Sequence, residues 1–94
     1  MEDKILDWAK ERDLLKTENQ WKQLAKLSEE VGELSRAMLK KDIAEQIDAL
    51  GDCVVVLTIL ANQLGFSLGN CTEKAYKIIE NREGKTIDGT FIRD

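Results

Sequence analysis

The stretch WKQLAKLSEEVGELSRAM, residues 21–38, determines how this chain folds. Its apolar residues recur every three or four positions: Trp21, Leu24, Leu27, Val31, Leu34 and Met38. That interval matches the turn of an α-helix and excludes a strand. Thr17 is followed three positions later by Gln20, a capping-box pattern, so we expect the helix to begin there and to end near Lys40.

Three further helices are expected on either side, over about residues 2–16, 43–64 and 67–83, the last capped by Ser67. Asp88-Gly89 between β-branched residues indicates a turn in a hairpin or ordered arm. There is no proline, internal repeat or linker. We therefore expect one domain over residues 1–94 with an all-α, four-helix-bundle-like fold and a short C-terminal arm or hairpin.

Composition excludes several functions. Both signs of charge are interspersed and the net charge is −4, so the clustered cations needed to bind nucleic acid are absent. The chain has no histidine. This excludes a serine or cysteine nucleophile that is activated by histidine, and it excludes a zinc site with histidine ligands. Catalysis would have to use carboxylates, lysines, arginines or a metal. Cys53 and Cys71 lie in apolar helical patterns, and we expect them to be buried without forming a disulfide.

The longest apolar run, residues 53–61, is too short to span a bilayer, and the N-terminal residues do not resemble a signal peptide. We expect a cytoplasmic protein with no membrane partner. The same run is apolar around the whole helix, which predicts burial on all sides. A chain of 94 residues has only a thin core of its own, and oligomerisation would help to cover this segment.

Acidic residues gather beside these apolar stripes. Glu30 and Glu33 are predicted neighbours on one flank of the stripe of residues 21–38, while Glu29 points to solvent. On the following helix, Asp48 and Asp52 share a face, and Glu45 lies near the same line. Carboxylates at the edge of a buried zone are costly unless they are paired or metal-bound, and Mg²⁺ prefers oxygen ligands. The alternatives are a solvated acidic face or ordinary salt bridges.

Gly51 and the last helix offer further candidates. Glycine inside a helix costs about 1 kcal/mol relative to alanine, so Gly51 suggests the close approach of a backbone or ligand. Polar and basic residues on one side of the last helix could contact a polyphosphate. These residues are Asn70, Lys74, Lys77 and Asn81, with Arg82 nearer the apolar side. An ordinary exposed face remains the alternative, and burial is the alternative to base stacking for Trp8 and Trp21.

The segments LSEEVGEL (residues 27–34) and DALGDCVVVL (residues 48–57) resemble the MazG family of all-α nucleoside triphosphate pyrophosphohydrolases. The segments WAKER (8–12), AYKIIENREGK (75–85) and DGTFI (88–92) are similar to the short MazG-like proteins of phages and Gram-positive bacteria. The family pattern is E-E-x-x-E followed by E-x-x-D. The first half is intact at Glu29, Glu30 and Glu33, whereas Ala49 stands three before Asp52 where the family has glutamate.

The resemblance implies hydrolysis of a (d)NTP to the monophosphate and pyrophosphate by a dimer, or dimer of dimers, whose subunits share the site. The metal ligands would be Glu30, Glu33, Asp48 and Asp52, holding Mg²⁺, for which Mn²⁺ could substitute. Glu29 or Glu45 would act on the attacking water as catalytic base. The phosphates would be bound by Lys74, Lys77, Asn81, Arg82 and Lys85.

Two other functions remain open. Ala49 leaves room for a non-catalytic dimerisation or nucleotide-binding module derived from the same fold. A plain helical scaffold is the other, and it predicts that Glu33→Gln and Asp52→Asn raise stability by relieving repulsion.

Overall fold

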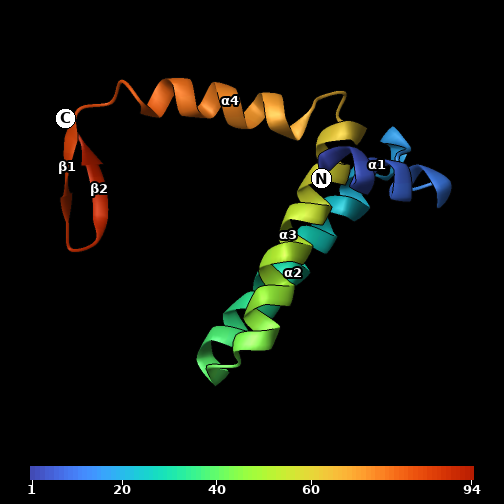
Figure 1. Cartoon of the computed structure of the whole chain (residues 1–94), viewed down its shortest axis with the longest axis horizontal. Helices are drawn as coiled ribbons and strands as arrows, with labels where there is room; N and C mark the ends of the chain where they lie inside the picture. The colour runs from blue at the N-terminus through green and yellow to red at the C-terminus, as the bar shows by residue number, and fades with distance from the viewer.

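The computed structural model describes residues 1–94 and contains four α-helices followed by a β-hairpin (Figure 1). The elements are α1 (Glu2–Glu11), a 3₁₀ turn η1 (Thr17–Asn19), α2 (Gln20–Lys40), α3 (Ile43–Gln63), α4 (Leu68–Ile79), β1 (Gly84–Ile87) and β2 (Thr90–Arg93). The prediction of four helices and a hairpin is confirmed.

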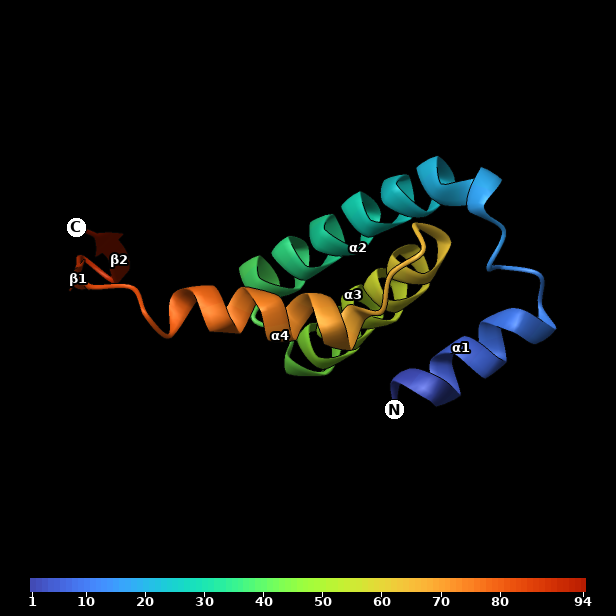
Figure 2. The same ribbon diagram turned by 90° about the horizontal axis from the view of Figure 1, so that it is seen from above.

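The body of the chain is a pair of antiparallel helices, α2 and α3, which lie side by side in both views (Figures 1 and 2). Lys41 ends α2 in the left-handed conformation, with φ of 58°. Asp42 then caps α3, because its carboxylate accepts a hydrogen bond of 3.0 Å from the Glu45 amide. Two residues thus reverse the chain and bring the acidic segments of both helices together.

The helix α1 ends at Glu11, earlier than the expected Lys16. Asp13 is left-handed, and the Leu14 amide donates to the Ala9 carbonyl at 3.0 Å, which closes the helix end. The Leu14 carbonyl then accepts a 2.8 Å hydrogen bond from buried Gln63 of α3. The capping box is wrong: Thr17 starts a 3₁₀ turn, and its side chain caps no backbone amide.

The helix α4 leaves α3 at an angle of 100° and extends with the hairpin away from the α2–α3 pair (Figure 1). Ser67 caps α4 as predicted, and the Glu2 carboxylate accepts hydrogen bonds from the Ser67 hydroxyl and the Gly69 amide. The helix ends at Ile79, short of Gly84. No single helix is long and apolar enough to cross a membrane; only α3 and α4 together, across their bend, meet that criterion.

The hairpin has the turn that Asp88-Gly89 predicts. Both residues have positive φ, and Ile87 pairs with Thr90 across the turn. Gly84 starts the hairpin opposite Arg93, where the partner strand comes very close. A Cβ at Gly84 would collide with the Ile92 carbonyl oxygen, so this position needs glycine.

The single chain is open, and no four-helix bundle forms within it. Its radius of gyration is 15.8 Å, whereas a compact domain of this length has about 12 Å. Val54 and Leu57 are exposed, so the expected burial of residues 53–61 on all sides is wrong for one chain. Cys53 is half-buried and Cys71 exposed, both as free thiols. The physical reason is that α4 points away and α1 contacts only part of α3, so the face of α3 that carries Val54 and Leu57 stays exposed.

Candidate metal centre

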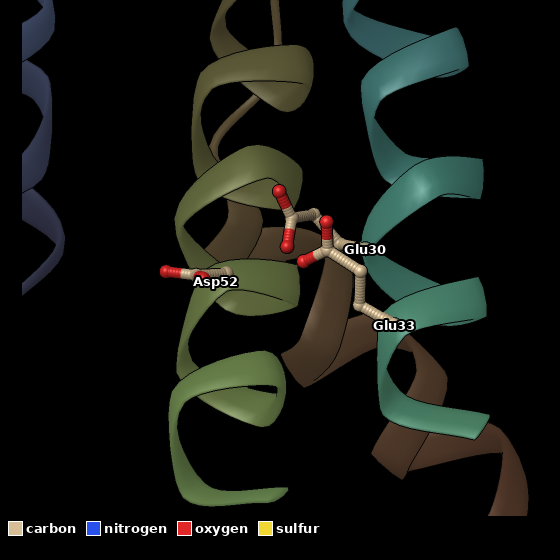
Figure 3. A group of neighbouring side chains, drawn as sticks. All are labelled: Glu30, Glu33 and Asp52. Atoms are coloured by element: carbon tan, nitrogen blue, oxygen red, sulfur yellow. The ribbon is translucent and has the colours of Figure 1, made fainter. Parts of the chain in front are cut away.

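Three carboxylates lie close together where α2 packs on α3, with Glu30 buried and Glu33 and Asp52 exposed. Glu30 and Glu33 project from α2 towards α3, and Asp52 lies on α3 (Figure 3). One carboxylate oxygen from each residue lies within 4.8 Å of the other two. We call these three residues the acidic cluster. The spacing of three between Glu30 and Glu33 places them on one helix face, and the reversal at Lys41–Asp42 brings Asp52 opposite.

Glu30 lies at the centre of the helix contact. Only 6% of it is exposed, and the face of α2 that packs on α3 consists of Gln23, Leu27, Glu30, Leu34 and Ala37. The sequence placed Glu30 on the flank of a stripe that included Val31 and Met38, but both of these are exposed. The stripe is displaced because α3 alone covers α2, and a single helix buries only a narrow strip of its neighbour.

The buried carboxylate of Glu30 is only partly compensated. Its Oε1 lies 3.7 Å from the ammonium of Lys26, and its Oε2 is buried without a hydrogen-bond partner. Burial raises the pKa of Glu30, and the neighbouring Glu33 and Asp52 carboxylates raise it further against the opposing charge of Lys26. A divalent cation among the three carboxylates would reverse this repulsion and supply the missing partner. The donors fit Mg²⁺, which prefers hard oxygen ligands.

A cavity of about 380 Å³ adjoins the acidic cluster and carries charges of both signs. It is lined by Glu33, Arg36 and Lys40 of α2 and by Glu45, Asp48, Ala49 and Asp52 of α3. We call it the charged pocket. Asp48 is not one of the three converging ligands but lines the pocket one turn before Asp52. Of the two catalytic candidates, Glu45 lines the pocket, whereas Glu29 is exposed and does not.

Ala49 occupies the inner wall of the charged pocket and is only 4% exposed. Its methyl group offers no ligand atom at the position where the family pattern has glutamate. Gly51 has no heavy atom within 4 Å of the position of a Cβ, so the close approach expected there is wrong for the single chain.

The polar and basic residues predicted to hold phosphates are all exposed, and none lines the charged pocket. Lys74, Lys77, Asn81, Arg82 and Lys85 lie on α4, on the segment after it and at the start of β1. Lys77 pairs with Glu73 at 3.4 Å, and the Asn81 amide donates to the Lys77 carbonyl at 3.2 Å. Within one chain, the structure does not bring these residues to the acidic cluster.

Sequence reasoning missed two pocket residues, Arg36 and Lys40. They stand three and seven positions after Glu33, which is one helical face, and that spacing could have identified them. Trp8 lines a second cavity of about 420 Å³ between α1 and α3, together with Asp52. Trp8 is 46% exposed and Trp21 is 73% exposed, so neither is a core residue of the single chain.

The chain is therefore a helical protein with a cluster of carboxylates contributed by two packed helices. The chain belongs to the MazG nucleotide pyrophosphohydrolase family, because residues 19–86 match the MazG nucleotide pyrophosphohydrolase domain. This match includes the acidic cluster and the whole charged pocket.

One relative is an uncharacterized 18.2 kDa protein from the rep-hol intergenic region of Haemophilus phage HP1 (strain HP1c1), which is 42% identical over 59 residues. The aligned region is 63% of this chain and 36% of the relative, so this chain matches only about a third of that protein's length. The comparison with solved structures gives no match.

Proposed function

We propose that the protein is a Mg²⁺-dependent pyrophosphohydrolase that converts (d)NTP to (d)NMP and pyrophosphate. The observation that carries this proposal is the buried Glu30 carboxylate, which has an unpartnered oxygen and converges with Glu33 and Asp52. Family membership supplies the nucleotide substrate class. A buried anion of this kind is costly in a purely structural role, since one exposed lysine at 3.7 Å compensates it only in part.

Each part of the proposed reaction has a candidate residue. Glu30, Glu33 and Asp52, together with Asp48, would hold Mg²⁺, with Mn²⁺ as a substitute. The metal would neutralise phosphate charge and make water a better nucleophile. Water adds to the α-phosphorus, the bond from that phosphorus to the bridging oxygen breaks, and its electron pair leaves with pyrophosphate. We assign the water proton to Glu45, which lines the charged pocket.

We further propose that the protein works as a homodimer or homotetramer. The chain exposes 7417 Å², whereas a compact monomer of its mass exposes about 5,500 Å². An exposed apolar stripe runs along α3 at Ile47, Leu50, Val54 and Leu57. The excess of about 1,900 Å² per chain, or about 3,800 Å² for two chains, is in the range that obligate dimers bury. In such an assembly, a second copy's α4 could bring its phosphate-binding residues to the acidic cluster.

Ala49 supports a second candidate function, a non-catalytic nucleotide-binding or dimerisation module. An alanine on the inner wall of the charged pocket removes a carboxylate from the metal shell that the family pattern implies. The enzyme hydrolyses nucleoside triphosphates, whereas the second candidate binds nucleotides without hydrolysing them or serves only in dimerisation.

The deciding experiment is pyrophosphate release from a panel of NTPs and dNTPs, measured with Mg²⁺ and with a chelator. The enzyme proposal requires turnover of at least one substrate, lost in chelator and reduced at least 100-fold in Glu33→Gln and Asp52→Asn. Glu18→Gln is the matched control, since Glu18 lies in η1 outside the cluster. Binding of nucleotides without turnover of any of them would favour the non-catalytic module.

A further inference from the structure

Arg36 and Lys40 are cations without an anionic partner. The chain contains three ion pairs, Arg12–Glu11, Lys26–Glu30 and Lys77–Glu73, and neither Arg36 nor Lys40 takes part in one. Both nevertheless line the charged pocket with four carboxylates. A pocket that keeps its cations and carboxylates apart can accept a ligand that itself carries both signs. A polyphosphate complexed with a divalent cation is such a ligand.

The two cations follow the acidic cluster along one face of α2. At 1.5 Å per residue, the backbone of Arg36 lies about 4.5 Å and that of Lys40 about 10.5 Å beyond Glu33 along the helix axis, and the Arg36 guanidinium turns back to within 3.7 Å of the Cβ position of Gly32. The pocket volume of about 380 Å³ falls within the range of small-molecule sites. An arginine matches two phosphate oxygens with its planar fork, and a lysine contributes a compact positive charge.

We propose that Arg36 and Lys40 form the subsite for the leaving pyrophosphate, the β- and γ-phosphates of the substrate. This assignment rests on the proposed function and gives the substrate a direction. The scissile bond lies at the acidic cluster, the pyrophosphate end extends towards Lys40, and the nucleoside lies on the opposite side of Asp52. The carboxylates of Glu45 and Asp48 on the facing wall repel bare pyrophosphate. Pyrophosphate binding at this site therefore requires Mg²⁺.

The test is calorimetric titration of the full chain with inorganic pyrophosphate, with and without Mg²⁺. The wild type is expected to bind only with Mg²⁺, and Arg36→Gln and Lys40→Gln should each weaken binding about tenfold. Lys41→Gln is the matched control: it removes the same charge from the next residue, which does not line the pocket. Thermal unfolding of each variant checks that it folds, which is the expected result because these side chains are exposed.

Equal pyrophosphate affinity in the Arg36→Gln/Lys40→Gln double variant and in Lys41→Gln would overturn the assignment. So would a wild type that binds pyrophosphate equally well without Mg²⁺. The assignment would also be overturned if pyrophosphate binding were weaker in a Lys74→Gln/Lys77→Gln variant and unchanged in the Arg36→Gln/Lys40→Gln variant. That result would place the pyrophosphate subsite on α4. These results are separate from the proposed function, which fails if the wild type hydrolyses no nucleoside triphosphate. An active wild type whose KM is unchanged in the double variant refutes only the subsite.

Discussion

Replacing Glu30 by glutamine tests whether the acidic cluster holds a metal. The change removes a negative charge from a side chain that is 6% exposed and has one unpartnered oxygen. It also removes the attraction to Lys26 at 3.7 Å, an i,i+4 pair worth about 0.3–0.5 kcal/mol because the lysine is half exposed. Burying a charged carboxylate beside Glu33 and Asp52 costs more than burying a neutral amide in the same place. Without metal, Glu30→Gln should therefore stabilise the chain by about 1 kcal/mol.

The assay is thermal unfolding at fixed protein concentration, in chelator and in Mg²⁺. For a domain of this size, 1 kcal/mol corresponds to a Tm change of about 4–8 °C. In chelator, the variant should melt higher than the wild type. Saturating Mg²⁺ should raise the wild-type Tm, with about 2.7 kcal/mol gained when the ion is present at 100 times its Kd. The Tm of the variant should rise much less with Mg²⁺. The difference in Tm between the variant and the wild type should therefore shrink or change sign.

The same comparison has a defined pH dependence. Burial raises the pKa of Glu30, so the folded chain holds this proton more tightly than the unfolded chain. The resulting stability is fully present below the ordinary glutamate pKa and is lost as pH rises through the raised folded value. In chelator, the advantage of Glu30→Gln should be small near about pH 4 and largest above the raised pKa.

Two results would refute this reasoning. A Glu30→Gln variant less stable than the wild type in chelator at neutral pH would show that the buried charge is adequately compensated. Equal stabilisation of both proteins by Mg²⁺ would place the ion elsewhere. A helical scaffold without a metal site also predicts that Glu30→Gln is more stable than the wild type in chelator. It predicts no effect of Mg²⁺ on either protein.

Three further predictions concern positions around the cluster. Ala49→Glu should raise Mg²⁺ affinity several-fold by calorimetry and lower the Tm in chelator, since it adds a further carboxylate beside the acidic cluster; unchanged affinity would mean that the side chain does not reach the ion. In a Trp21→Phe background, fluorescence of Trp8 should change on adding a nucleoside monophosphate but not pyrophosphate, because Trp8 lines a cavity with Asp52; an equal response to both would contradict this. Gln63→Ala should lower the free energy of unfolding, measured by denaturant titration, by about 1–3 kcal/mol, because it removes the hydrogen bond to Leu14. The Tm shift caused by Mg²⁺ should be unchanged in this variant.

The local structure of the chain was predictable from its sequence. The helical repeat of α2, the Ser67 cap and the Asp88-Gly89 turn depend on residues a few positions apart, and the structure confirms all three. The pairing of Glu30 with Glu33 is also local, because any α-helix brings residues three apart together. The same periodicity placed Asp48 and Asp52 on one face of α3, though it did not select Asp52 over Asp48 as the residue closest to Glu30 and Glu33.

The tertiary structure decided which of these local features matter. Whether Glu30 lies at the edge or at the centre of the buried face depends on how α3 is rotated against α2, which no pattern within α2 specifies. The direction of α4 depends on contacts of Glu2 with the start of that helix, across most of the chain. The spacing of Arg36 and Lys40 after Glu33 places them on one face of α2, but only the tertiary structure shows that α3 supplies the opposite wall of their pocket. Helix periodicity is set by hydrogen bonds within one segment, whereas helix rotation and direction are set by side-chain packing between segments distant in sequence.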